Sequence, residues 1–144
     1  MLIAVLITTV SWGLGGVFDK LGLDSMPDMP ATSAVVVRQT MALVALGIWL
    51  SVTMSLKELR RVPALAWVYL AISGIFGVGI GGIAYFYAVQ HGEISTVVVF
   101  CSGYPMLTLF LAVPFLREAV TWPKGVGTLL VVGGLVLLSV SGAG

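Results

Sequence analysis

The chain has 144 residues, of which 59% are hydrophobic and only 9% are charged, and its formal net charge is +1. A soluble domain is typically about 25% charged, so this composition excludes a soluble globular protein. The near-neutral charge also gives no indication of a nucleic-acid partner. The apolar residues form continuous blocks of about 20 residues, the length that a helix needs to cross a bilayer. The sequence therefore predicts an all-α membrane protein, folded as a single domain over residues 1–144.

Five apolar blocks, separated by short polar or proline-containing connections, are predicted to be the transmembrane helices of one bundle. Their ranges are 2–22, 31–54, 64–90, 94–116 and 123–141. Barrel strands are excluded because they would be about ten residues long and would alternate in polarity. The first block is interpreted as a membrane span and not as a cleaved signal peptide, because it lacks a basic start and a small-residue cleavage site.

The positive charges predict an orientation in the membrane. Basic residues follow the second and fourth blocks, whereas the connections after the first and third blocks carry none. The basic set comprises Lys57, Arg60, Arg61, Arg117 and Lys124. Since short loops rich in Lys and Arg stay in the cytoplasm, we expect a cytoplasmic N-terminus and an external C-terminus. The expected location is the cell membrane (plasma or inner membrane), which the chain crosses several times.

Ionisable side chains inside membrane spans are costly and are therefore candidates for function. Asp19 and Lys20 lie near the outer end of the first span, and Arg38 lies about 10 Å of helical rise into the second. Two interpretations are open. Either Asp19 neutralises Arg38 or Lys20, or the three residues form a gate or an anion-attracting funnel at the outer mouth of a substrate path. Mid-membrane acidic residues are missing from all five blocks, which argues against coupling through a buried carboxylate.

Small residues recur at helix-packing intervals in two spans. Gly77 and Gly81 form a GxxxG pair in the third span, and Gly127 and Gly134 are spaced as a heptad in the fifth. Small residues allow helices to approach closely in lipid. These glycines are predicted either to pack helices within the bundle or to form a dimerising surface.

Pro105 lies in the middle of the fourth span and is expected to bend that helix, because proline removes a backbone hydrogen bond. Irregular backbone at membrane depth occurs where it is buried in protein or lines a cavity. Tyr104, beside the bend, is therefore expected to face Tyr85, Tyr87 and Gln90 of the third span in a polar-aromatic cavity. Anchoring at the membrane interface is the alternative for the tyrosines.

The sequence lacks the motifs of soluble enzymes. With one His and one Cys, it offers no Cys/His metal cluster, and it contains no phosphate-binding glycine loop and no nucleophile elbow. We therefore predict no catalytic residues, no metal, no cofactor and no enzymatic activity.

Several short patterns together resemble an EamA-like domain of the drug/metabolite transporter superfamily. The first half carries Ser11-Trp12-Gly13, then Lys20 and Arg38. The second half carries Tyr85-Phe86-Tyr87-Ala88, then Pro105, then Leu116-Arg117-Glu118 where that family has Leu-Gly-Glu, and then Gly127 and Gly134. The resemblance extends over nearly the whole chain with order and spacing preserved. It implies that Trp12, Asp19, Lys20, Arg38, Tyr85, Tyr104 and Pro105 are candidates for lining a substrate path.

Most members of that family resemble two such five-helix units in one chain, related as an inverted repeat, with substrate sites near the midplane between the repeats. This sequence has room for one unit only, and it shows no internal repeat. The resemblance therefore implies a half-size secondary transporter that pairs with a second five-helix unit, in a homodimer or with a paired subunit. Its substrate would be a small metabolite or amphipathic compound, moved by alternating access. A subunit of a lipid-linked sugar flippase and a non-transporting membrane assembly subunit are the alternatives.

Overall fold

The structure is a computed structural model that describes residues 1–53 and 56–141. Within these residues the regular elements are all helices, and five helical stretches are long and apolar enough to cross a membrane. They are Leu2–Asp24, Ala31–Thr53, Ala64–His91, Ile94–Leu116 and Trp122–Ser139. The predicted all-α fold with five apolar helices long enough to span a membrane is thereby confirmed. The predicted last residue of the second span, residue 54, lies outside the described residues.

Contacts divide the chain into two compact parts. The N-terminal subdomain is Met1–His91 and the C-terminal subdomain is Gly92–Gly144. The N-terminal subdomain contains α1 (Leu2–Asp24), α2 (Ala31–Thr53), the short α3 (Leu56–Leu59), α4 (Ala64–Gly74), the π-helix η1 (Ile75–Ile80) and α5 (Gly81–His91). The C-terminal subdomain contains α6 (Ile94–Cys101), α7 (Tyr104–Leu116) and α8 (Trp122–Ser141).

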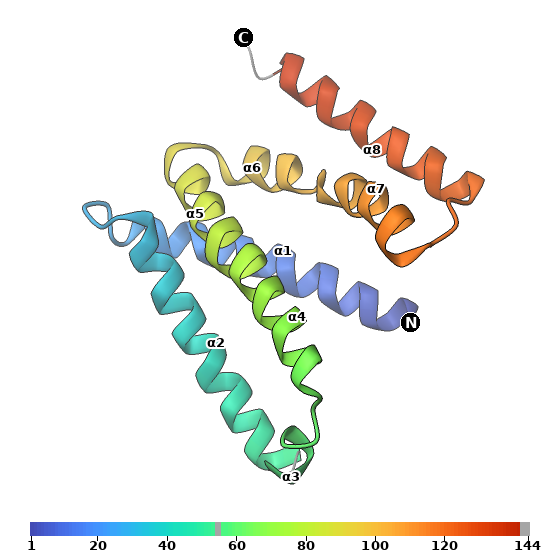
Figure 1. Ribbon diagram of the computed structural model, residues 1–144. Helices are drawn as coiled ribbons and strands as arrows, with labels where there is room; N and C mark the ends of the chain where they lie inside the picture. The colour runs from blue at the N-terminus through green and yellow to red at the C-terminus, as the bar shows by residue number, and fades with distance from the viewer. Residues whose placement is uncertain (54–55, 142–144) are drawn as a thin grey trace. The chain divides into compact units, whose positions relative to one another are not determined.

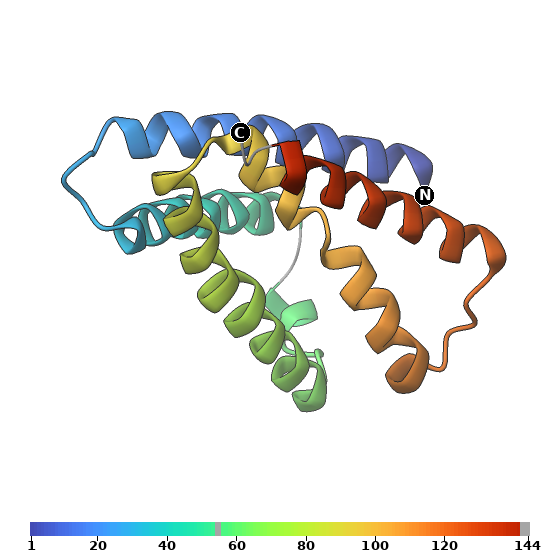
Figure 2. The same cartoon turned by 90° about the horizontal axis from the view of Figure 1, so that it is seen from above.

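The core of the N-terminal subdomain lies where the end of α1, the start of α2 and the end of α5 meet (Figure 1). Its buried apolar side chains are Leu23, Ala31, Ala34, Val35, Phe86 and Val89. Away from this junction the helices separate (Figure 2), and the outer surfaces of α1, α2 and α4 carry large exposed apolar side chains. Because lipid tails are as apolar as these side chains, exposure of the side chains costs little free energy in a bilayer. The helices are held together by van der Waals packing at the junction.

The third span changes its helical geometry midway. Residues Ile75–Ile80 form a π-helix, and the N–H of Gly81 at its end donates to the carbonyl of Phe76, five residues earlier. A Cβ added to Gly81 would lie 3.0 Å from that carbonyl oxygen, so the absence of a side chain suits this turn. A π-turn displaces the following residues around the helix axis relative to an α-helix. The small residues that recur along this span at α-helical intervals therefore do not stay on one face of it.

The displaced register determines which glycine meets a neighbouring helix. A Cβ added to Gly82 would lie 3.8 Å from Cγ1 of Val35 on α2, whereas one added to Gly77 would have no neighbour within 4 Å. Gly82, which the GxxxG pattern does not include, is therefore the glycine that packs against α2. Gly77 does not contact α2, and its alternative role at a dimerising surface stays a prediction.

The fourth span is two helices instead of one bent helix. It breaks after Cys101, and α7 begins at Tyr104 with Pro105 in its first turn. Proline is well accommodated there because the first N–H groups of a helix have no intrahelical partner. Gly103 occupies the break, where a Cβ would lie 2.9 Å from Cδ1 of Leu135 on α8 and 3.2 Å from the carbonyl oxygen of Phe100. The prediction of an irregular backbone was correct, but the interruption precedes Pro105.

A left-handed residue terminates α7. Arg117 has φ 55° and ψ 32°, a conformation that an L-residue with a side chain adopts at a cost of roughly 1 kcal/mol or more. Its N–H donates to the carbonyl of Ala112, and so does the N–H of Glu118, at 3.4 Å. Helices commonly end with a residue in this left-handed conformation, and glycine is preferred there. This preference explains why the Leu-Gly-Glu pattern has glycine at the position that Arg117 occupies here.

Candidate functional site

A polar cluster joins the three helices at the junction of the N-terminal subdomain. Nε of Arg38 on α2 lies 3.3 Å from Oδ1 of Asp19 on α1. The Asp19 side chain is only 10% exposed, whereas that of Arg38 is 46% exposed. Tyr85 on α5 donates a hydrogen bond from its hydroxyl to the Asp19 carboxylate. These three residues, which we call the Asp19 cluster, therefore connect α1, α2 and α5 through one carboxylate.

An aromatic ring supports the guanidinium of the cluster. Cζ of Arg38 lies 5.7 Å from the ring centroid of Phe86, within the range of a cation–π interaction. Phe86 is 2% exposed, and its ring makes an edge-on contact with Tyr85, with centroids 5.5 Å apart. The arginine is thus positioned by a carboxylate and by a buried aromatic face together.

Lys20 belongs to a separate pair beside the cluster. Its Nζ lies 3.2 Å from Oδ1 of Asp24, one helical turn later on α1, and donates to the carbonyl of Val89 at 3.2 Å. Val89 is fully buried near the end of α5, where backbone carbonyls lack partners within the helix. Lys20 therefore satisfies a carbonyl at the C-terminal end of α5 and attaches α1 to it.

Two further hydrogen bonds hold the end of α5. Nε2 of Gln90 donates to the carbonyl of Met29 at 3.0 Å, which attaches α5 to the connection between α1 and α2. Nδ1 of His91 lies 2.8 Å from the carbonyl oxygen of Tyr87, and the ring centroids of His91 and Tyr87 are 4.3 Å apart. Gln90 thus has a structural contact within its own subdomain, and no sequence pattern predicted this contact.

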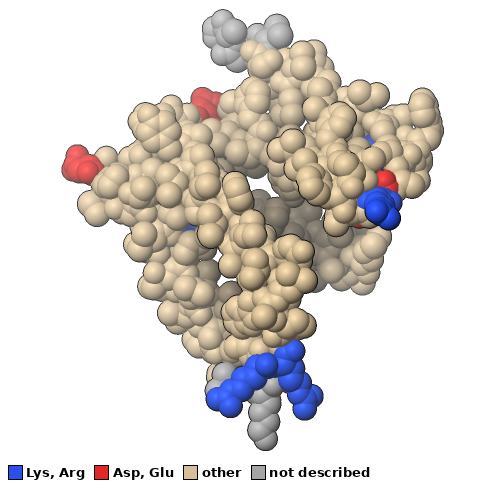
Figure 3. Space-filling view, viewed as in Figure 1, with Lys and Arg blue, Asp and Glu red and all other residues tan. Residues whose placement is uncertain are grey.

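The charges of this region are balanced. Arg38 is paired with Asp19 and Lys20 with Asp24. Figure 3 shows that Asp and Glu atoms lie at the end of the N-terminal subdomain that carries the α1–α2 connection, whereas Lys and Arg atoms gather at the end that carries α3. Arg38 and Lys20 therefore each lie beside a carboxylate, and a role of these residues as a gate or funnel stays a prediction.

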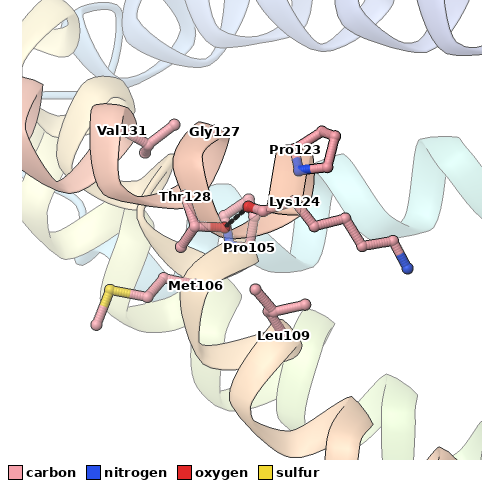
Figure 4. A pocket seen from close by; sticks show the side chains of 8 residues that line it. All are labelled: Pro105, Met106, Leu109, Pro123, Lys124, Gly127, Thr128 and Val131. Carbon is pink, nitrogen blue, oxygen red and sulfur yellow. Dashed lines mark hydrogen bonds between the residues drawn. The ribbon is translucent and has the colours of Figure 1, made fainter. Parts of the chain in front are cut away.

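A second feature lies within the C-terminal subdomain. A groove between α7 and α8, with a volume of about 310 Å³, is lined by residues of both helices (Figure 4). Its lining comprises Pro105, Met106, Leu109, Pro123, Lys124, Gly127, Thr128 and Val131. Pro105 and Gly127 were candidates from the sequence, whereas the other six were not. These residues lie in the first two turns of α7 or on one face of α8, and the sequence did not indicate that these two segments are neighbours.

The N-terminal subdomain thus consists of apolar helices that are joined at one end by a polar cluster. Among residues 1–53 and 56–141, no group of His, Cys, Asp and Glu side chains is arranged to hold a metal ion. Residues 1–140 match the EamA-like transporter family. The chain belongs to this family.

A relative of this EamA-like protein has a similar extent. An uncharacterized protein of Methanocaldococcus jannaschii is 29% identical over 136 residues, which cover 94% of this chain and 93% of that protein. No solved structure matches the chain. The family match spans both subdomains, so α1 to α8 together form one EamA-like region.

The structure brings some of the predicted site residues of the EamA-like chain together and leaves others apart. Asp19, Arg38 and Tyr85 form one cluster. Trp12 lies two helical turns before Asp19 on α1 and is 65% exposed. Tyr104 is 58% exposed and belongs to the C-terminal subdomain, so its predicted position opposite Tyr85 stays a prediction. Gly127 and Gly134 have no atoms within 4 Å of an added Cβ.

Proposed function

We propose that this EamA-like protein is a half-size secondary transporter that works as a pair of units and moves a small metabolite or amphipathic compound by alternating access. The observation that carries the proposal is the family match over residues 1–140. Residues 1–53 and 56–141 supply five candidate spans, half the number of a two-repeat member. In inverted-repeat transporters the substrate site forms between the repeats, so a single unit requires a partner to complete the path.

The archaeal relative supports a half-size unit as a working form. Its match covers 93% of its own length, so the relative also has room for a single unit. Gly77 and Gly134 have space around an added Cβ, which suits contacts with helices of a partner. The Lys and Arg bias favours one orientation, with the N-terminus inside, in the plasma or inner membrane. That bias favours a parallel homodimer or a partner subunit of opposite orientation.

We assign the Asp19 cluster to the outer gate of this transporter. The cluster connects three helices at the end that the charge bias places outside, and its ion pair lies at 3.3 Å with Arg38 half-exposed. A partly buried pair gains little net stability, because desolvation offsets most of the Coulomb attraction. Water that enters an opening gate would therefore replace the pair at low cost, as a reversible lock requires.

The π-helix supplies a position at which the third span can bend during alternating access. On one side of η1, α5 packs against α1 and α2 and contains the buried Phe86 and Val89. On the other side, α4 has no buried residue. Gly74 and Gly77 have open space around them. π-turns are frequent at functional sites in helices, and here one separates an anchored half-span from a loosely held one.

The test is transport in proteoliposomes, with solutes chosen by a screen for compounds that stabilise the purified protein against heat. The expected result is uptake or counterflow of a stabilising solute, reduced at least about tenfold in Arg38→Ala, a loss of about 1.4 kcal/mol. Arg60→Ala is the matched control, because it removes an exposed arginine in the connection before α4. Equal transport by the two variants would remove the gate assignment.

The alternatives give different results in the same experiment. Movement of a lipid-linked sugar without movement of soluble compounds would indicate the flippase subunit. Absence of any movement, with or without a second subunit encoded nearby, would indicate a non-transporting assembly subunit and overturn the proposal.

A further inference from the structure

We propose that the groove between α7 and α8 binds one anionic phospholipid, with an acyl chain along the groove and the phosphate at Lys124. The site lies wholly within the C-terminal subdomain. It is distinct from the Asp19 cluster and does not depend on transport by the protein.

The shape and chemistry of the groove suit a hydrocarbon chain. Its volume of about 310 Å³ lies at the lower end of the roughly 300–1,000 Å³ typical of small-molecule sites. Met106, Leu109 and Val131 present apolar side chains, and Gly127 has no atom within 4 Å of an added Cβ, so this position leaves the groove open. The Thr128 hydroxyl already donates to the carbonyl of Lys124 at 2.9 Å, as the dashed line in Figure 4 shows.

A cation lies at one end of this apolar lining. Lys124 is in the first turn of α8, and its side chain extends away from Met106 and Val131 (Figure 4). It is 49% exposed, and its Nζ lies 3.5 Å from Oε2 of Glu118, which is 51% exposed. An exposed pair at this distance is weak, and an ammonium has three donors. Lys124 can therefore contact a phosphate oxygen while it stays near Glu118.

The surroundings of Lys124 place it at the depth of lipid headgroups. Trp122, in the same turn, is 83% exposed, and exposed Trp side chains at span ends are typical of the membrane interface. Arg117 and Lys124 belong to the basic set predicted on the cytoplasmic side, where anionic lipids attract basic residues. The first turn of α8 also contributes the positive end of a helix dipole. An apolar groove that ends at a cation at headgroup depth is complementary to an anionic phospholipid.

The test uses the full-length protein in detergent and native mass spectrometry with dioleoyl-phosphatidylglycerol or dioleoyl-phosphatidylcholine, which share acyl chains and differ in headgroup charge. The wild type is expected to retain one phosphatidylglycerol in preference to phosphatidylcholine. Lys124→Gln should reduce that preference about fivefold, the effect of one basic residue near a membrane surface. Gly127→Leu should fill the groove and weaken both lipids.

Gly133→Leu is the matched control, because Gly133 also lies on α8 with no atom within 4 Å of an added Cβ, yet does not line the groove. Val131→Trp replaces Gly127→Leu if the latter does not give folded protein by circular dichroism. An unchanged headgroup preference in Lys124→Gln, or equal lipid binding by the groove variants and Gly133→Leu, overturns the proposal. The lipid proposal is also overturned if Gly127→Leu loses the dimer but keeps its bound lipid. In that case the groove would bind a second copy of this chain.

Discussion

Asp19 places a carboxylate on a helix whose other surfaces are largely apolar and exposed. With only 10% of its side chain exposed, this carboxylate depends on Arg38 and Tyr85 for the interactions that water would otherwise provide. Removal of one partner of such a pair is more damaging than removal of both, because it leaves one charge desolvated and unpaired. The energetic role of the pair is therefore best measured by comparing single and double variants.

Arg38→Ala is expected to lower the free energy of unfolding by about 1–2 kcal/mol, less than for a fully buried pair because Arg38 is half-exposed. The double variant Asp19→Asn with Arg38→Gln should recover more than half of this loss, since it leaves neither charge unpaired. The measurement is unfolding of the purified protein by titration of a denaturing detergent, with Arg60→Ala as the control. If the double variant lost as much stability as Arg38→Ala or more, the Asp19–Arg38 pair would not be energetically coupled.

Arg117 is a position where the sequence does not suit the backbone. Arg117→Gly is expected to raise the stability of the protein by about 0.5–1 kcal/mol, because glycine adopts φ 55° without the steric cost. Arg117→Ala removes the same charge but keeps a Cβ, so it should not stabilise. The same detergent titration distinguishes the two. If alanine stabilises as much as glycine, charge and not backbone conformation determines the effect.

At the scale of helices, the spans were predictable, whereas the positions of their irregularities were not. Long apolar runs between prolines and charged residues define the five spans directly, because the bilayer fixes the length that must be apolar. The apolar runs do not mark the π-helix at Ile75–Ile80, and the break at Ser102–Gly103 lies at a tertiary contact. The contact of Gly103 with Leu135 is an example, since nothing in the local sequence indicates which residue lies opposite.

Gly82 and Gly77 test the displaced register of the third span. Gly82→Leu is expected to lower the free energy of unfolding by about 1–3 kcal/mol, since the larger side chain must displace Val35 from the packed junction. Gly77→Leu should change the stability of the monomer by less than about 0.5 kcal/mol, because its surroundings are open. Gly82→Ala, with 3.8 Å available to the Cβ, should be tolerated. The reverse order of the two leucine variants would indicate an uninterrupted α-helix.

Gly77→Leu has a second readout if the glycine contacts a partner unit. We expect this variant to reduce the dimeric fraction, measured by chemical cross-linking in membranes, while the monomer keeps its stability. Gly82→Leu would instead impair both properties together, because Val35 and the other buried residues of the junction hold the N-terminal subdomain together. The two glycines therefore separate packing within the chain from packing between chains.

For the whole molecule, part of the candidate site followed from the sequence. Asp19, Lys20 and Arg38 were identifiable because charges are rare in apolar spans, and the structure pairs each of them. The roles of Lys20 at the Val89 carbonyl and of Gln90 at the Met29 carbonyl were not identifiable. Backbone carbonyls become partners only after the helices have met, and the sequence does not encode which carbonyls then lack a donor.

The orientation of the chain determines which dimers it can form. In a Cys101→Ala background, a membrane-impermeant maleimide is expected to label Asp28→Cys from outside intact cells and to label Arg61→Cys only after permeabilisation. The reason is that the connection containing Arg61 is basic and is therefore expected to stay in the cytoplasm, whereas the connection between α1 and α2 carries no Lys or Arg. Both positions are exposed, so equal labelling after permeabilisation provides the control for thiol reactivity.

Partial labelling of both positions in intact cells would mean that the chain inserts in two orientations. An antiparallel homodimer would then reproduce the inverted repeat from one sequence, and no separate partner would be needed. Labelling of Asp28→Cys alone excludes that arrangement and requires a parallel homodimer or a second subunit with the opposite charge bias. If the chain works as the proposed half-size transporter, its topology therefore decides which kind of second unit completes the path.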